Sequence, residues 1–469
     1  MSGMQMVSDA AATARAVAHV DGPEETHAVV FSGGGADGAY EVGVLKALCS
    51  GRSPTTGYEP IEPKIFVGTS IGSFNAAYLV SQWDEYGLSS ISNLATTWLE
   101  RIADTDANPR GGGTYRIRLN PLDLIDPRRY VHDPIAPLAD FTRDVTFLGW
   151  DGVQRVANLF TDSAPMIDRV SGLFNIGSLV SVAPWEKTLR ETINYRNLRR
   201  SSRTLRIAAT NWAQGEVRVF GNHDMTDRMG PQVIRASSAV PGFFPVAQVG
   251  AQPYVDGAVL MNTPLKPAVH AGGTVLHVIY MNADVKNMPL KRLESTVDSL
   301  YRTQIIAWAE AVNRDIKRAA SYNEGLAMLA RAHDAQEVQG DDAEHYLGAA
   351  GPVLRRLKQG RLYRPLTIHR YYPRDGLDDA LGFFDVRRTR IERLIEQGFA
   401  DAVNYDVDVR QSVVPDAQAL ALLKKLDPRL WGGPGAGSGV DDPGPDPRPD
   451  PPPSLATDPA TASGLASPA

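Results

Sequence analysis

A serine between two glycines is the residue best placed to act as a nucleophile. Ser70 lies in Gly68–Gly72, a G-x-S-x-G pattern with the sequence Gly-Thr-Ser-Ile-Gly. The apolar residues Ile65–Val67 precede it, and a run with helical character follows it. Flanking glycines allow a tight turn from strand to helix that exposes the serine hydroxyl. Such a serine can attack an ester carbonyl, and it can also simply cap the following helix.

A serine hydroxyl needs a base, and one carboxylate stands at a suitable corner of the backbone. Asp256 ends the strand expected over Tyr254–Asp256 and is followed by Gly257 and Ala258, which form a turn. A carboxylate held there can accept a proton from a nearby hydroxyl. The alternative is an ordinary turn aspartate, a common residue at such corners.

Three consecutive glycines form a third motif that can take part in a reaction. Gly33, Gly34 and Gly35 follow a core strand expected over Ala28–Phe31 and precede a helix expected from Ala39. The free backbone N–H groups at a helix N-terminus favour negative charge. The loop can therefore hold a phosphate, or it can stabilise the oxyanion of an acyl-transfer reaction.

These motifs, in this order, resemble those of the patatin-like phospholipase family. The family pattern is G-G-G-x-[KR]-G, then G-x-S-x-G, then D-G-[GA]. The matching segments here are Gly33–Gly38, Gly68–Gly72 and Asp256–Ala258. Arg235–Pro245 is similar to the block that usually precedes the aspartate, and Ile391–Ala402 resembles the helix that closes many bacterial members.

The resemblance implies both a fold and an activity. The implied fold is a three-layer α/β/α arrangement with a mostly parallel central sheet and a helical insertion covering the site. The implied activity is that of a serine acyl hydrolase that cleaves carboxylic esters of phospholipids or lysophospholipids, with no metal and no organic cofactor. The residues it implies are a catalytic dyad of Ser70 and Asp256 without a histidine, an oxyanion hole of Gly33, Gly34, Gly35 and Gly38, and an elbow with Gly68 and Gly72.

One position departs from the family pattern. Asp37 stands where the family usually has lysine or arginine. A carboxylate that pointed toward the oxyanion would oppose the charge that develops there. We therefore expect the Asp37 side chain to point to solvent.

Two other interpretations of the motifs remain open at this point. The first is a Ser-Asp-His triad, since His270 and His277 follow Asp256 in the chain. His277, however, falls inside a core strand expected over Thr274–Met281. The second is a nucleotide-binding loop, since Gly33–Gly38 also satisfies G-x-G-x-x-G although it lacks the G-K-[ST] of a phosphate loop.

The strand and helix patterns divide the chain into regions. Thr26–Val80 alternates strand, helix, strand and helix, which indicates an α/β fold with a largely parallel sheet. We expect a short or disordered segment over 1–25, a hydrolase domain over 26–405 with an insertion at about 104–200, a helical segment over 406–431, and a disordered Pro/Gly-rich tail over 432–469. Within the hydrolase domain, helices are expected over 299–329, around 345–357 and over 391–403.

Two groups of side chains, in the insertion and just after it, can be interpreted either as ligand-binding or as purely structural. Apolar residues of the insertion can line an acyl-chain pocket or pack the insertion onto the main domain: Leu148, Trp150, Phe160, Met166, Leu173, Phe174, Ile176 and Leu179. Arginines of the segment Tyr195–Arg206 can meet anionic headgroups or form a solvated helix end.

Composition limits the remaining possibilities. The 469 residues are 43% hydrophobic and carry a formal net charge of −6, which gives no signal for nucleic-acid binding. The single cysteine, Cys49, excludes an intramolecular disulfide and is expected to be a buried thiol. Residues 1–25 show no signal-peptide pattern, so we expect a cytoplasmic protein that works on lipid at the membrane surface or on monomers. The oligomeric state stays open.

Overall fold

The computed structural model describes nine stretches of the chain. They are residues 25–105, 108, 111–120, 135–161, 179–281, 296–339, 365–374, 382–405 and 412–426. The segments 1–24 and 427–469, the expected helix around 345–357, and Met166, Leu173, Phe174 and Ile176 lie outside these stretches.

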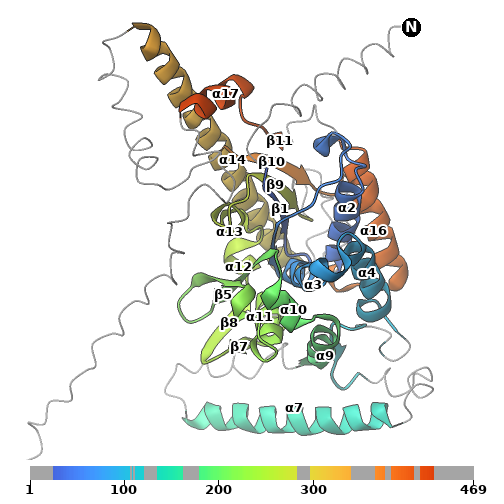
Figure 1. Cartoon of the computed structure of the whole chain (residues 1–469). Helices are drawn as coiled ribbons and strands as arrows, with labels where there is room; N and C mark the ends of the chain where they lie inside the picture. The colour runs from blue at the N-terminus through green and yellow to red at the C-terminus, as the bar shows by residue number, and fades with distance from the viewer. Residues whose placement is uncertain are drawn as a thin grey trace, which may run out of the picture.

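A mixed sheet forms the centre of the fold (Figure 1). Its strands, in spatial order, are β11 (Ser412–Val413), β10 (Thr367–Tyr371), β9 (Val275–Ile279), β1 (His27–Phe31), β2 (Ile65–Thr69), β5 (Thr204–Asn211), β8 (Gln252–Asp256) and β7 (Ala247–Val249), with β6 (Glu216–Gly221) also paired to β5. The five central strands, β10 to β5, run parallel to one another. The outer strands pair antiparallel, so the predicted, mostly parallel sheet is confirmed.

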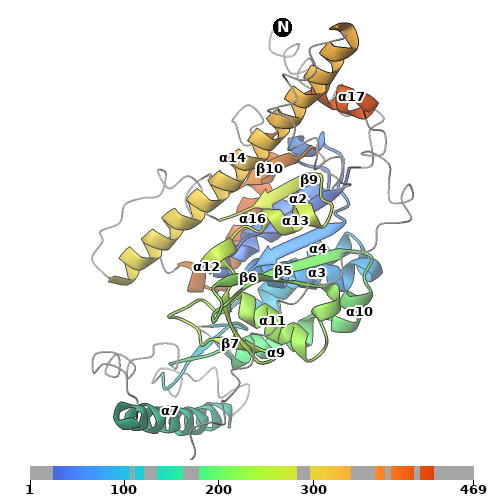
Figure 2. The ribbon, with the colours of Figure 1, turned by 90° about the vertical axis from the view of Figure 1, so that its left-hand side faces the viewer.

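Alternate residues of the central strands pack on opposite layers of helices. Val29 and Phe31 of β1 face a core formed mainly with α2 (Gly38–Cys49), α3 (Ile71–Tyr86) and α16 (Arg388–Val403). Ala28 and Val30 face a second core formed with α13 (Leu265–His270) and α14 (Thr296–Gln339). This alternation is what a strand buried on both faces requires. The result is the three-layer α/β/α arrangement, with α13 and α14 on one side of the sheet and α2 and α16 on the other (Figures 1 and 2).

The remaining elements surround this body. The helices are α4 (Ser89–Thr97), α9 (Ala183–Thr192), α10 (Tyr195–Arg200), α11 (Met229–Ser237), α12 (Ala258–Met261) and α17 (Ala417–Leu426), with the short turns η1 (Gly35–Asp37) and η7 (Gly382–Phe384). The predicted insertion also contains α7 (Ala136–Thr161) and two antiparallel strands, β3 (Arg116–Ile117) and β4 (Val180–Ser181), which pair from either side of α7 in the chain. Figure 2 shows α7 set apart from the three layers.

Several local predictions can be compared with these bounds. The helix expected over 299–329 is the longer α14, and the one expected over 391–403 is α16, which begins three residues earlier. Cys49 is buried, as expected, and burial raises the pKa of its thiol far above the usual range. Among the described residues, we find no helix with the length and apolar character needed to cross a bilayer.

Candidate active site

A sharp turn between β2 and α3 carries Ser70. The backbone of Ser70 has φ 54° and ψ −127°, a conformation that a residue with a side chain rarely adopts. The turn is tight because Gly68 lies against the backbone of Gly72: a Cβ on Gly68 would lie 2.2 Å from the Gly72 carbonyl oxygen. Gly72 in turn packs against Phe31 and Ser32. The two glycines of the motif thus permit the strained serine, as the pattern predicts.

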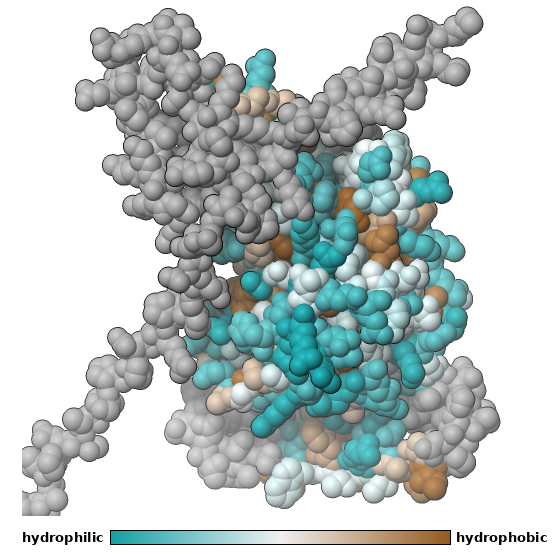
Figure 3. Space-filling model, viewed as in Figure 1, coloured by the Kyte–Doolittle hydropathy of each residue, from teal (hydrophilic) through white to brown (hydrophobic). Residues whose placement is uncertain are grey.

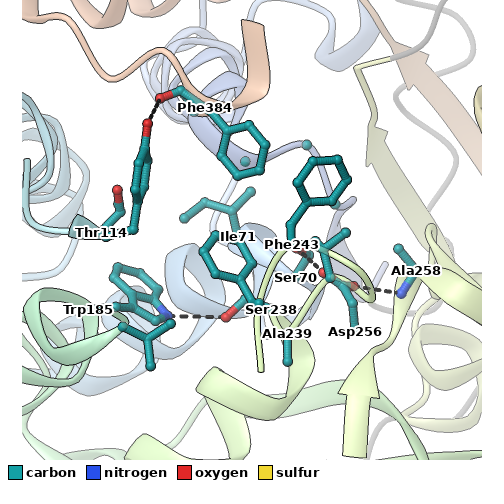
Figure 4. Close-up of a pocket in the computed structure, with 18 of the residues that line it drawn as sticks. Ser70, Ile71, Thr114, Trp185, Ser238, Ala239, Phe243, Asp256, Ala258 and Phe384 are labelled. Atoms are coloured by element: carbon teal, nitrogen blue, oxygen red, sulfur yellow. Dashed lines mark hydrogen bonds between the residues drawn. The ribbon is translucent and has the colours of Figure 1, made fainter. Parts of the chain in front are cut away.

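The structure brings Ser70 and Asp256 together from strands β2 and β8 (Figure 4). The Ser70 hydroxyl donates to Asp256 Oδ2 at 2.7 Å, and the Ala258 N–H donates to the other carboxylate oxygen at 2.8 Å. On the other side, the Ser70 N–H donates to Ser237 Oγ at 2.9 Å. Each residue of the pair is therefore held by a second hydrogen bond, Ser70 through its backbone and Asp256 through its other carboxylate oxygen.

The electrostatic setting of Asp256 differs from that of a surface carboxylate. Only 1% of the residue is exposed. Burial raises the pKa of Asp256 to about 7, against the smaller opposing effects of the hydrogen bonds from the Ala258 N–H and the Ser70 hydroxyl. A carboxylate with this pKa is a stronger base than an ordinary aspartate, and near neutral pH it can both accept and return a proton.

The glycine loop lies beside Ser70, but its four predicted members are not equivalent. The Gly33 N–H donates to Asn262 Oδ1 at 3.1 Å, and the Gly38 N–H is bonded within the η1 turn to the Gly35 carbonyl. Gly34 and Gly35 both line the cavity that contains Ser70. Their N–H groups have no acceptor among the described residues, which leaves these two free to bind an oxyanion.

The expectation for Asp37 is wrong: its side chain is buried rather than directed to solvent. Asp37 Oδ1 accepts from Arg390 at 2.6 Å, and the two residues are 6% and 4% exposed. Arg390 also donates to the Asp385 carbonyl at 3.4 Å, next to Phe384 of the cavity wall. The departure from the family pattern is thus balanced by a cation from another element, because a buried carboxylate without a partner would be costly.

Helix α16 reaches the glycine loop because it packs unusually close to α2. A Cβ on Gly398 of α16 would lie 2.1 Å from the Tyr40 carbonyl oxygen, and one on Gly43 of α2 would lie 2.0 Å from the Ile395 carbonyl oxygen. A pair of glycines therefore lets the two backbones touch. The helix resembles its counterpart in the family from Ile391 onward, but nothing in the sequence around Arg390 connects that arginine with Asp37.

A cavity of about 450 Å³ opens over Ser70 and Asp256. Its walls are mainly apolar, and Phe243, Phe244, Phe384 and Tyr115 form a cluster of ring contacts on one side. The walls also contain Trp185 and Trp308, together with the non-helical block 240–245. These residues come from five separate stretches of the chain, so their common role was not visible in the sequence.

Among the described residues of the insertion, those near its two ends contribute to the cavity. Thr114, Tyr115, Val182 and Trp185 line the cavity. Trp150 and Leu179 are 67% and 47% exposed and do not. Among the arginines of 195–206, Arg199 donates to the Met225 carbonyl and to Asp227, and Arg203 pairs with Glu62. These contacts favour the interpretation of this segment as a solvated helix end over that of a cationic patch that binds headgroups.

The two histidines of the triad alternative lie elsewhere. His277 is fully buried in β9, where its ring nitrogens bond to His27 at 3.0 Å and to the Tyr371 hydroxyl at 3.1 Å. Burial lowers the pKa of His277 well below its usual value, so it is a neutral core residue. His270 ends α13. Neither histidine lines the described part of the cavity, which removes the support for a triad.

Comparison with known proteins agrees with these motifs. A family model described as patatin-like phospholipase matches residues 29–269. Among solved structures, the crystal structure of VipD from Legionella pneumophila is similar at a TM-score of 0.30 and 15% identity, over 81% of this chain and 66% of VipD. The aligned part is thus slightly less than two thirds of VipD. No curated protein gives a significant match. Because the family model spans more than half of the chain and includes Ser70 and Asp256, the protein belongs to the patatin-like phospholipase family, whose members are lipid acyl hydrolases.

Proposed function

We propose that this protein hydrolyses carboxylic esters of phospholipids or lysophospholipids through a Ser70–Asp256 dyad. The observation that carries the proposal is the 2.7 Å hydrogen bond from a strained serine to a buried carboxylate, at the floor of an apolar cavity. An apolar wall suits an acyl chain better than the phosphates and ribose of a nucleotide, so the nucleotide-binding alternative has less support.

The first half of the reaction forms an acyl-enzyme. Ser70 Oγ attacks the ester carbonyl while its proton passes to Asp256 Oδ2. The N–H groups of Gly34 and Gly35 stabilise the oxyanion of the tetrahedral intermediate, while Gly33 and Gly38 hold the loop in place. Asp256 then gives the proton to the leaving alcohol, and the acyl group remains on Ser70.

The second half regenerates the serine. Asp256 takes a proton from a water molecule, which attacks the acyl carbonyl. The same N–H groups stabilise the second oxyanion. Collapse of this intermediate breaks the bond to Ser70 Oγ, which regains its proton from Asp256, and the fatty acid leaves. The cycle uses only side chains and backbone groups of this chain.

Covalent labelling tests the proposal. A long-chain alkyl fluorophosphonate should form one adduct, on Ser70, and should abolish fatty-acid release from phosphatidylcholine, lysophosphatidylcholine and a short-chain p-nitrophenyl ester. Mass spectrometry of the digested protein locates the adduct. Ester hydrolysis that continues after complete labelling, or an adduct on another serine, would contradict the assignment of Ser70.

The pH dependence of the reaction is a second prediction. Because Asp256 must be ionised to act as a base and its pKa is about 7, kcat/KM for the short-chain ester should rise with pH and level off about one unit above that value. A pH profile of initial rates measures this. An acidic limb near pH 4 would show that the base is an ordinary exposed carboxylate and not Asp256.

The raised pKa of Asp256 also affects stability, which should fall as pH rises whereas activity should increase. Between pH 3.8, the usual pKa of an aspartate, and about 7, the unfolded chain has lost the proton that folded Asp256 still holds. The contribution of this group to the free energy of unfolding therefore falls as pH rises through that range. Asp256→Asn should remove this part of the pH dependence in urea unfolding experiments.

A further inference from the structure

Helix α7 exposes apolar side chains along its whole described length. Trp150, Leu138 and Val153 are 67%, 63% and 62% exposed. Phe141, Val145 and Phe147, with Ile135 just before the helix, are also exposed. A helix on the surface of a globular protein normally turns its apolar side chains inward. This helix does not, and side chains of this size exposed together mark a surface that contacts something else.

The inner side of α7 is polar. Asp144 is 1% exposed and accepts two hydrogen bonds from the Arg116 guanidinium, both at 2.7 Å. Asp140 lies 3.6 Å from the same guanidinium. These contacts attach the helix to β3 by charged groups, a reversal of the usual amphipathic arrangement. The attachment uses the carboxylates and one face of the Phe147 ring, which lies 3.9 Å from the Arg118 guanidinium carbon. The other exposed apolar side chains stay outside.

The charges of the outer side follow from this reversal. Arg143 is the exposed charged residue between Ile135 and Val153, and its guanidinium lies 3.4 Å from Asp140. Asp140 and Asp151 are half-buried and Asp144 is buried. An outer face with apolar side chains, a tryptophan and a cation but no exposed carboxylate has the composition of a helix that lies in a membrane interface. Protein interfaces are also depleted in carboxylates, so the choice of a lipid surface follows from the lipid substrate proposed above.

The position of α7 connects this face with the cavity. The strand pair β3–β4 that holds the helix is flanked by Tyr115 just before β3 and by Val182 and Trp185 after β4, and these three residues line the cavity. Figures 1 and 2 both show α7 as a separate rod beyond β7 and α9. Apolar atoms are visible at the surface where it lies (Figure 3).

We propose that the outer face of α7, from Ile135 to Val153, docks the protein on a lipid bilayer that contains anionic headgroups. The apolar side chains enter the boundary between headgroups and acyl chains, and Arg143 meets the headgroups. The helix lies in the plane of the surface and does not cross it. The choice of a lipid surface rests on the proposed function, but the docking itself needs no catalysis.

Vesicle binding tests the proposal separately from activity. The full chain carrying Ser70→Ala should sediment with vesicles of phosphatidylcholine and phosphatidylserine, and less strongly with phosphatidylcholine alone. The double variant Phe141→Asp and Trp150→Asp should bind at least about tenfold more weakly, because it adds two charges to the docking face. The matched control is Trp212→Asp, since Trp212 is 55% exposed at a turn outside α7. It should bind as the parent does.

The other outcomes also decide the question. Equal binding of the α7 variant and the control would overturn the proposal, and so would a parent protein that stays in the supernatant. If the parent is a dimer in solution and the α7 variant is a monomer, the face binds a second copy and the lipid assignment is wrong. With Ser70 restored, the α7 variant should keep its rate on the short-chain ester and lose rate only on vesicles. Loss of both rates would count against the proposed active site and not against the docking surface.

Discussion

Asp256→Asn is expected to lower kcat/KM for ester hydrolysis by a factor of about 10²–10⁴, the usual contribution of a positioned general base. The asparagine has the same shape, and its amide oxygen can still accept from the Ala258 N–H at 2.8 Å. It cannot take the proton from Ser70 Oγ. The fold should therefore persist while the chemical step fails. Steady-state rates with the short-chain ester and a urea unfolding curve measure the two effects.

A matched aspartate separates this effect from general damage. Asp84 accepts two hydrogen bonds from Ser202 on the exposed surface, outside the cavity. Asp84→Asn should leave kcat/KM within about twofold of the wild type, as surface substitutions usually do. If Asp256→Asn retains more than a tenth of the activity while folding normally, another group is the base and the dyad is wrong.

Arg390→Met is expected to have the largest effect on stability. It removes the partner of buried Asp37, and breaking a buried ion pair on one side costs about 3–5 kcal/mol in the free energy of unfolding. The loss should also loosen the glycine loop, because Asp37 belongs to the η1 turn that begins at Gly35. Urea unfolding and kcat/KM should fall together.

Two further variants identify the cause. Arg388 is an exposed arginine two residues before Arg390 on α16, and it pairs with Glu392 on the surface. Arg388→Met should therefore lower the free energy of unfolding by less than about 1 kcal/mol. In the double variant Asp37→Leu and Arg390→Met, no charge is left buried, and stability should return toward that of the wild type. A double variant as unstable as Arg390→Met alone would show that the arginine acts through packing and not through Asp37.

The sequence was sufficient to predict the residues that meet at the carboxyl ends of the central strands. Ser70 and the glycine loop each follow a strand, and the parallel strands β1 and β2 bring these two ends together. Asp256 ends β8, which runs antiparallel to β5, and its pairing with Ala209 places it beside them. The alternation of β1 residues between two cores follows from the same local pattern. Each of these features depends on a few neighbouring residues, so a local sequence pattern is enough to predict it.

Other parts of the site depend on contacts that no local pattern contains. Asp37 and Arg390 are 353 residues apart, and nothing near either residue indicates the other. The aromatic wall combines Trp185, Trp308 and Phe384 from three regions. The orientation of α7 was missed for a different reason: its apolar residues were assigned to a pocket or a core, and only the contact of Asp144 with Arg116 shows that the helix faces the other way.

The distance along the chain between Asp37 and Arg390 also sets an order of events during synthesis. A ribosome that adds roughly 5–20 residues per second needs roughly 20–70 s to cover those 353 positions. For most of that interval Ser70 has already been made, while the cation that neutralises Asp37 has not. The neighbour of β1 on its other side, β9, is also late. Under the proposed mechanism, a nascent chain therefore carries Ser70 without a fixed glycine loop, and hydrolytic competence is expected only when α16 docks, as the last part of the site to form.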